Sequence, residues 1–339
     1  MDTDVPPSWQ LIALMDGFLT TQLIYVAAKL GIADLLQDGP RTGAELAVDV
    51  GAEHEPLNRV LRGLAAVGVL AEDTGDRFAL TDLGRALGPL RDMALVRGGV
   101  YYSAAAGLLD SVRYGDVAFE RVYGEAFFDH LAQHPDLEGA FQGSMAGRSA
   151  QEAADVLAVY DFTGLRTLVD VGGGHGVLIA AILKAHPELD GILLDRDSVL
   201  DGAPPLLQRA GVSERVRCVP GDFFTEVPPG ADAYVLSRVL HDWSDVDARR
   251  ILHICRRALP RHGRIVIIEA ILPDRATEQP FAIGMDLHML LLFGARERTR
   301  AQFHALLREA GFAVRSITPT ASPAGLSVIE AIPDVTVDR

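Results

Sequence analysis

The chain has 339 residues, of which 49% are hydrophobic and 23% are charged, a composition typical of folded globular domains. Its formal net charge is −15, and a field of that sign repels phosphate backbones and anionic lipid surfaces, so we expect neither nucleic acid nor membrane as a partner. Cys218 and Cys255 have no metal-binding spacing and predict two reduced thiols. No basic segment precedes an apolar core at the N-terminus, and no run reaches the ~18 apolar residues of a spanning helix. These features predict a cytoplasmic protein.

The N-terminal part of the chain shows helical periodicity followed by a hairpin pattern. Residues 11–36 carry apolar side chains at helical spacing, and Thr42 with Glu45 has the form of a capping box at the start of a short helix. A further helix is expected to start at Pro56 and to end at a capping Gly68. The segment VLAEDTGDRFALT then predicts two short strands around an acidic turn. Helix, helix, helix and hairpin is the order of a winged helix.

The remainder of the chain divides into a helical part and an alternating part. Residues 96–160 are expected to be helical and to end in a long helix from about residue 137 to residue 159. From TLVDVGG onward, apolar strands alternate with helices, which predicts a largely parallel sheet covered by helices on both faces. The last two strands are joined by a short turn and must be antiparallel, so we expect a mixed edge. The predicted divisions are residues 1–95, 96–160 and 161–339.

A glycine-rich loop follows the first strand of the alternating part. In LVDVGGGHG, Gly172, Gly174 and Gly176 occupy the turn into the next helix, at the carboxyl end of a strand, where open α/β sheets bind ligands. The spacing is G-x-G-x-G, whereas the dinucleotide fingerprint is G-x-G-x-x-G. The loop therefore favours a nucleoside cofactor other than a nicotinamide dinucleotide.

Acidic residues follow the next two strands as well. Asp195 ends the strand ILLDRD, 21 residues after Gly174, where a carboxylate can accept hydrogen bonds from both ribose hydroxyls. Asp222 follows the third strand and could accept from an adenine amino group while Phe223 packs on the base. Acids in register at successive strand ends indicate one nucleoside-binding site.

His241 directly follows the strand LSRVL and is therefore expected at the mouth of the sheet, on the cofactor side. A histidine in that place is suited to removing a proton from an acceptor. Asp242 allows two interpretations: it belongs to the site, or it caps the helix that begins near Ser244.

The segments VDVGGGHG, LLDRD, PGDFF, LSRVLHDWSD, IVIIEAILP and GARERT occur in an order that resembles the S-adenosylmethionine-dependent O-methyltransferases, which include plant caffeic-acid and flavonoid enzymes and bacterial polyketide-tailoring enzymes. The resemblance implies an α/β fold, with a Rossmann-like methyltransferase domain after a mostly helical winged-helix dimerisation domain. It also implies a homodimer, an acceptor pocket to which residues 96–160 contribute, and catalysis without a metal.

The resemblance also assigns roles to individual residues. His241 matches the general base, and Glu269 and Glu297 match the acids that flank it. The residues that match cofactor contacts are Arg148, Gly172, Gly174, Asp195, Asp222, Phe223 and Ser237. Phe141 and Met145 match positions that line the acceptor pocket, and His288 and Met289 are further candidates for that pocket.

The predicted function is methyl transfer from S-adenosylmethionine, with S-adenosylhomocysteine as the product, to a phenolic hydroxyl of a small aromatic or polyketide-type natural product. Two catalytic alternatives stay open: a nitrogen acceptor, or other chemistry on the same fold and cofactor, such as hydroxylation, decarboxylation or cyclisation. A DNA-binding regulator is disfavoured, because the candidate recognition helix PLNRVLRGLAAVG carries only Arg59 and Arg62 as basic residues.

Overall fold

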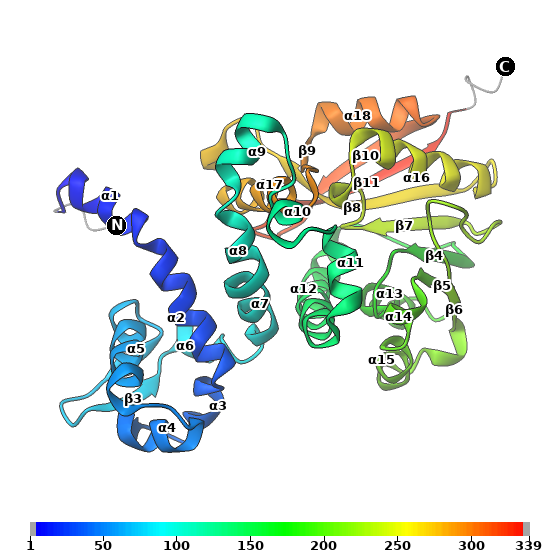
Figure 1. The fold of residues 1–339 in the computed structure, drawn as a ribbon. Helices are drawn as coiled ribbons and strands as arrows, with labels where there is room; N and C mark the ends of the chain where they lie inside the picture. The colour runs from blue at the N-terminus through cyan, green and yellow to red at the C-terminus, as the bar shows by residue number, and fades with distance from the viewer. Residues whose placement is uncertain (1–4, 335–339) are drawn as a thin grey trace. The chain divides into compact units, whose positions relative to one another are not determined.

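The computed structural model describes residues 5–334. The described residues form two compact units, the first comprising residues 5–106 and 131–144 and the second comprising residues 107–130 and 145–334 (Figure 1). Two helices carry residues of both units, α11 (Phe127–Gln133) and α12 (Pro135–Val159). The long helix predicted from about residue 137 to residue 159 is confirmed. It begins two residues earlier than predicted, at Pro135, because proline is well suited to the first turn of a helix.

The first unit has the element order of a winged helix. Thr42 accepts a hydrogen bond from the Glu45 amide and Glu45 bonds back to Thr42, which confirms the capping box. The helix expected to start at Pro56 starts at His54, so the proline lies inside its first turn. Gly68, with φ of +80°, follows the end of that helix as predicted. The elements are α1 (Pro7–Met15), α2 (Gly17–Lys29), α3 (Ile32–Leu35), β1 (Arg41–Thr42), α4 (Gly43–Val50), α5 (His54–Ala66), β2 (Leu70–Glu72), β3 (Arg77–Leu80), α6 (Asp82–Arg85), α7 (Arg91–Val96), the π-helix η1 (Arg97–Tyr101) and α8 (Tyr102–Ala105), with strand order β1-β3-β2.

The second unit is built on an eight-stranded sheet of order β10-β11-β8-β7-β4-β5-β6, with β9 paired to β8. Strands β4 to β8 pair in parallel, whereas β11 is antiparallel to both β8 and β10, so the predicted mixed edge is confirmed. The strands are β4 (Thr167–Val171), β5 (Asp190–Asp195), β6 (Val216–Pro220), β7 (Ala233–Ser237), β8 (Arg264–Leu272), β9 (Arg298–Thr299), β10 (Phe312–Pro319) and β11 (Leu326–Pro333).

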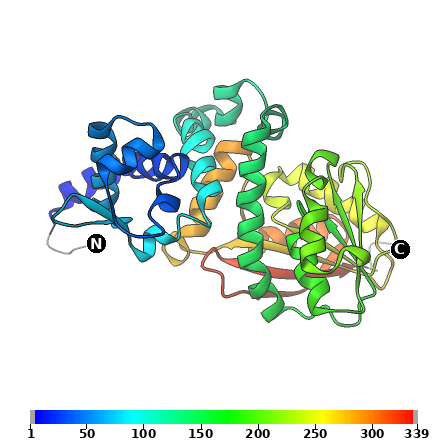
Figure 2. The same ribbon diagram turned by 90° about the horizontal axis from the view of Figure 1, so that it is seen from below.

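Helices cover both faces of this sheet, as Figures 1 and 2 show. The first face packs against α16 (Asp245–Ala258) and α18 (Arg300–Glu309), and the opposite face packs against α13 (Val177–Ala185), α15 (Ala203–Ala210) and the C-terminal part of α12. The remaining helical elements of the second unit are α9 (Leu108–Tyr114), α10 (Ala118–Tyr123), α14 (Asp197–Leu200), η2 (Ser213–Arg215), η3 (Leu240–Asp242), η4 (Ala276–Glu278) and α17 (Pro280–Phe293).

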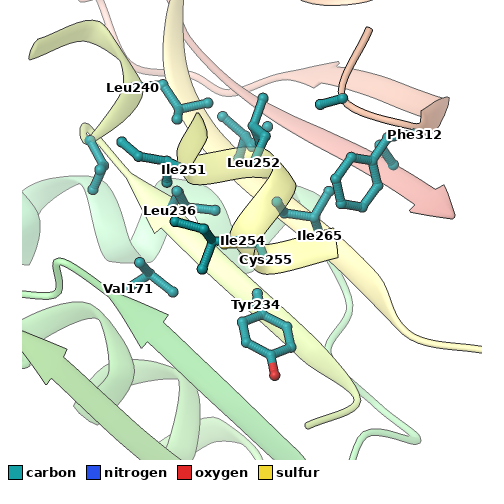
Figure 3. Packing of buried hydrophobic residues seen from close by; sticks show 14 of the residues in the cluster. Val171, Tyr234, Leu236, Leu240, Ile251, Leu252, Ile254, Cys255, Ile265 and Phe312 are labelled. Carbon is teal, nitrogen blue, oxygen red and sulfur yellow. The ribbon is translucent and has the colours of Figure 1, made fainter. Parts of the chain in front are cut away.

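The core between the sheet and α16 is close-packed (Figure 3). Ile251 and Leu252 of α16 are fully buried against Leu236 and Ile265 of the central strands. Burial of each such side chain stabilises the fold by ~1.5–3 kcal/mol, and truncation to alanine would cost ~2–5 kcal/mol. This core supports the strand ends that carry the candidate site.

The N-terminal helices expose large apolar side chains in the single chain. Trp9, Leu14 and Met15 of α1 are 61–63% exposed, and Phe18 and Leu19 of α2 are 50% and 52% exposed. Within residues 5–334, no single helix is both long and apolar enough to cross a membrane; the bent pair α1 and α2 passes that test only together, by length and composition.

Candidate active site

The glycine-rich loop leaves β4 in a conformation that requires glycine. Gly172, Gly174 and Gly176 have φ of +69°, +61° and +80°, in the region that side chains other than glycine rarely adopt. A Cβ on Gly172 would lie 3.1 Å from Val239 and 3.3 Å from the ring of Phe223. The predicted loop is therefore present, and Gly172 lies directly beside Phe223.

Asp195 ties this loop to the end of β5. One oxygen of its carboxylate accepts from the Gly174 amide at 2.8 Å, and the other accepts from the Arg196 amide at 2.7 Å. Burial raises the pKa of Asp195, and these two amides oppose the rise. The fully buried Asp170 has its pKa raised to about 7, by burial and by the nearby Asp195 charge. Two acids thus lie together under the loop, and Asp195 is held in place by the glycine turn.

The turn after β6 carries the predicted adenine pair. Asp222 accepts from the Phe224 amide at 2.8 Å and from the Thr225 hydroxyl at 3.3 Å, so its carboxylate holds its own turn. Phe223 packs edge-on against Trp243, with ring centroids 6.0 Å apart. The structure therefore brings Phe223, the glycine loop and Asp195 to one end of the sheet, and the adenine contact of Asp222 stays a prediction.

His241 lies in the turn η3, four residues after the end of β7, and is 5% exposed. Its Nδ1 lies 2.8 Å from Oε1 of Glu297 and 3.6 Å from Oε2 of Glu269. Its Nε2 lies 3.4 Å from Oδ1 of Asp242. The three residues assigned to catalysis from the sequence, together with Asp242, form one buried cluster.

The protonation of this cluster is strongly perturbed. Burial alone would lower the pKa of His241, but the carboxylates of Glu269, Glu297 and Asp242 raise it to about 9. Burial raises the pKa of Asp242 to about 6, and the positive charges of His241, Arg148 and Arg238 oppose that rise. Burial raises the pKa of Glu269 to about 7, against the charge of His241. The imidazole is therefore a stronger base here than in water.

Buried groups hold the backbone of the turn from both sides. Oε1 of Glu269 accepts from the amide of Leu240 at 2.9 Å and from the amide of His241 at 3.4 Å. On the carbonyl side, Arg298, only 1% exposed, donates to the carbonyls of Leu240 at 2.7 Å and Trp243 at 2.9 Å. The imidazole is consequently presented by a fixed backbone.

Arg298 is itself fixed by Asp245, whose Oδ1 accepts from Nε at 3.0 Å. The sequence argument missed this pair. The available signal was the second aspartate of HDWSD and the arginine that follows Glu297 in GARERT, since both motifs carry a charged residue that the predicted chemistry does not use.

The alternative role for Asp242, as a helix cap, is wrong. Ser244 is the N-cap of α16, because its hydroxyl accepts from the Asp247 amide at 3.2 Å. A serine two residues later satisfies the free amides, which leaves Asp242 to pack beside His241.

The remaining candidate residues lie on the following elements. Ser237 ends β7 opposite Ile268, and Arg148 is close enough to Asp242 to lower its pKa. Met145 is in the second unit, whereas Phe141 is in the first, so their common role in an acceptor pocket stays a prediction. The candidates on α17 are the half-buried His288 and the buried Met289.

The comparisons with known proteins cover both units. The O-methyltransferase domain model matches residues 106–313, and the O-methyltransferase dimerisation domain model matches residues 12–88. A phenazine O-methyltransferase of Lysobacter antibioticus is 44% identical over 97% of each chain. A phenazine-1-carboxylate N-methyltransferase of Pseudomonas aeruginosa is 35% identical over 91% of this chain and 92% of its own.

Among solved structures, the O-methyltransferase NcsB1 of neocarzinostatin biosynthesis, in complex with S-adenosylmethionine and 2-hydroxy-5-methyl naphthoic acid, superposes with a TM-score of 0.80. It is 35% identical over 93% of this chain and 96% of its own. The resemblance drawn from the sequence motifs is thereby confirmed, and the chain is a methyltransferase that belongs to the O-methyltransferase family.

Proposed function

We propose that this methyltransferase moves a methyl group from S-adenosylmethionine to a phenolic hydroxyl of a small aromatic natural product, with His241 as the general base. The observation that carries the proposal is the buried His241 ring, held 2.8 Å from Glu297 at the end of β7. Gly172 directly follows the adjacent strand β4. A Cβ atom on Gly172 would lie 3.1 Å from the side chain of Val239, which is in the same loop after β7 as His241.

The residues at the carboxyl ends of β4, β5 and β6 fit a nucleoside cofactor. The positive φ angles of the loop let the backbone approach a ligand closely, and Asp195 is half-buried beside the loop with both oxygens oriented by amides. S-adenosylmethionine would supply a methyl group already activated by a positive sulfur. The residues that we propose hold it are Arg148, Gly172, Gly174, Asp195, Asp222, Phe223 and Ser237.

The chain must remove the acceptor's proton while it holds the acceptor in line. A phenol has a pKa near ~10 and an ordinary histidine near ~6.5, a gap of about 3.5 units or ~5 kcal/mol. The carboxylates around His241 raise its pKa to about 9, which narrows the gap to roughly 1 unit or ~1.4 kcal/mol. Glu297 on Nδ1 also orients the ring, and we propose that Nε2, 3.4 Å from Oδ1 of Asp242, receives the acceptor's proton.

A hydroxyl acceptor is favoured over a ring-nitrogen acceptor on chemical grounds. Related enzymes include N-methyltransferases, but a neutral ring nitrogen, unlike an amino group, attacks with its lone pair and has no proton to lose. A buried base supported by carboxylates is needed only where a proton must leave. The intact cluster of His241, Glu269 and Glu297 likewise favours methyl transfer over other chemistry on this fold. The side chains proposed to line the acceptor pocket are Phe141, Met145, His288 and Met289.

We propose that residues 1–95 form a homodimer interface. The exposed apolar side chains of α1 and α2 lie where the dimerisation model matches or immediately before it. Large exposed apolar patches on folded chains mark interaction sites. Light scattering is expected to give twice the chain mass of 36.4 kDa, and a stable monomer at micromolar concentration would contradict the assignment.

We also propose that catalysis needs no metal. His241, Glu269 and Glu297 offer three donor atoms within 4.8 Å of one another, so the question has a direct test. Chelation with EDTA is expected to leave the rate unchanged. A loss that zinc or magnesium restores would make this cluster a metal site instead.

The function is tested by mass spectrometry of candidate phenols, such as hydroxyphenazines and hydroxynaphthoates, incubated with enzyme and cofactor. A gain of one methyl on oxygen is expected. In single turnover, His241→Ala and His241→Gln should be ~10²–10⁴-fold slower, the usual contribution of a general base, with cofactor affinity unchanged. His304→Ala, an exposed histidine on α18, is the control. A loss of less than about threefold at His241 would remove the base assignment.

A further inference from the structure

Arg238 forms a buried ion pair at the end of β7 that the proposed function leaves unexplained. Its Nε donates to Oε2 of Glu152 at 2.9 Å, and its Nη2 bonds Oε1 of the same carboxylate. The two side chains are only 9% and 11% exposed. A pair so fully removed from water must be held by its surroundings, because desolvation opposes the attraction between the charges.

The backbone of Arg238 is also strained. Its φ is +53°, a conformation found at only one other non-glycine residue, Asp76, in the part of the chain that the structure describes. Its amide donates to the carbonyl of Ile268 at 3.0 Å, which fixes the point where the chain leaves the sheet. A side chain in this region of φ is unfavourable, and such residues cluster at ligand sites, where the surrounding structure enforces them.

The guanidinium keeps one donor group unused. Glu152 takes the edge formed by Nε and Nη2, and the buried Nη1 has no hydrogen-bond partner among residues 5–334. Buried donors are rarely left without a partner, so this one points to a missing ligand. Its surroundings belong to the active site, because Arg238 and Arg148 are both close enough to Asp242 to oppose the rise of its pKa.

The elements that carry these groups converge from two directions. Arg148 and Glu152 are four residues apart on α12 and therefore lie on one face of that helix. Arg238 and His241 lie in the β7 loop, three residues apart. The free edge of the Arg238 guanidinium, formed by Nη1 and Nη2, has the fork geometry that matches a carboxylate.

We propose that Arg238 is a ligand-binding residue, whose Nη1 donates to a carboxylate oxygen in the reaction complex. The inference rests on the proposed function only for the two sources of that carboxylate: the amino-acid end of the cofactor, or a ring carboxylate on the aromatic acceptor. Glu152 and the fixed backbone position the guanidinium for this contact.

Calorimetry on the full chain separates the two sources. The cofactor side compares S-adenosylhomocysteine with 5′-methylthioadenosine, which lacks the amino-acid end. The acceptor side compares 1,4-dihydroxy-2-naphthoate with 1,4-dihydroxynaphthalene on protein saturated with S-adenosylhomocysteine. Arg238→Gln should weaken one carboxylate probe by about 10- to 100-fold, as for a hydrogen bond between charged groups, and its carboxylate-free counterpart by less than about threefold. Arg257→Gln, on the exposed face of α16, is the matched control for loss of a positive charge.

Equal weakening of both members of each pair, or no weakening of any probe, would overturn the proposal. Binding of S-adenosylhomocysteine to the unmodified protein tests the proposed function, whereas the ratio between variant and unmodified protein tests Arg238. If Arg238→Gln fails to fold because Glu152 is left without a partner, the double variant Arg238→Met/Glu152→Met removes both charges and should show the same selective loss. Arg238→Lys should give an intermediate loss, since it keeps the charge and loses the fork.

Discussion

The carboxylate of Glu297 should determine the pH range in which the enzyme works. It lies 2.8 Å from Nδ1 of His241, and both groups are buried. Replacement by glutamine keeps the shape and the ability to accept a hydrogen bond but removes the negative charge. An opposite charge at this distance shifts a pKa by ~1–3 units, and Glu269 and Asp242 remain in the variant. We therefore expect Glu297→Gln to lower the pKa of His241 from about 9 by ~1–2 units, equivalent to ~1.4–2.7 kcal/mol.

The assay is single-turnover methyl transfer between pH 6 and 10, at saturating acceptor. In the unmodified enzyme the rate should rise with pH as His241 loses its proton. In Glu297→Gln that rise should move to lower pH, while the plateau falls by ~10- to 10²-fold because the neutral ring is a weaker and less well oriented base. A ring-nitrogen NMR titration of His241 measures the same shift without turnover. The control is Glu309→Gln, which removes a carboxylate of α18 that pairs with Arg249.

One result would refute this reasoning. If the plateau falls in Glu297→Gln but neither the pH profile nor the NMR titration moves, the carboxylate does not set the basicity of His241. Its role would then be confined to packing.

Three further predictions follow from the contacts around the site. Asp195→Ala should weaken S-adenosylhomocysteine binding by at least ~10-fold, because a half-buried acceptor oriented by two amides is lost. Calorimetry that shows unchanged affinity would remove the ribose assignment. The pKa of Asp170 is raised in the folded state, so protonated Asp170 stabilises the fold below about pH 4, and this stabilisation is lost as the pH rises through about 7. Thermal melts should therefore show a smaller loss of stability between pH 4 and 8 for Asp170→Asn than for the unmodified protein. Arg298→Gln should lower kcat by a larger factor than it changes KM, and it should narrow the pH range over which the enzyme is active. Arg296 is an exposed partner of the same Asp245, and Arg296→Gln should change neither kcat nor KM by more than about twofold.

The sheet and the strand-end residues could be predicted from the sequence because they depend on short-range patterns. Alternation of apolar strands and helices implies parallel strands, and the carboxyl ends of parallel strands meet at one edge. Gly172 follows β4, Asp195 ends β5 and His241 lies four residues beyond β7, so their convergence required no knowledge of side-chain packing. The start of α5 was displaced by two residues because proline is tolerated throughout the first helical turn.

The contacts that orient the site could not be predicted in the same way. The bond between His241 and Glu297 joins residues 56 positions apart, and the pair of Arg238 and Glu152 joins residues 86 positions apart. Nothing in the local sequence indicates which buried arginine faces which carboxylate. The positive φ of Arg238 is equally hidden, since an arginine does not favour that conformation and only the tertiary structure enforces it.

The raised pKa of His241 has opposite effects on two parts of the rate. In the reaction that we propose, it brings the pKa of His241 closer to that of a phenol, which lowers the barrier to proton transfer, but it also leaves fewer of the rings neutral near pH 7. A positive charge beside the imidazole shifts this balance, because like charges disfavour protonation. In the reaction that we propose, the sulfonium of S-adenosylmethionine would supply such a charge, and S-adenosylhomocysteine would not. The carboxylates of Glu269, Glu297 and Asp242 therefore suit a site that holds a positively charged cofactor while the acceptor loses its proton. After methyl transfer the cofactor would be neutral, and the same carboxylates would then keep a proton on His241.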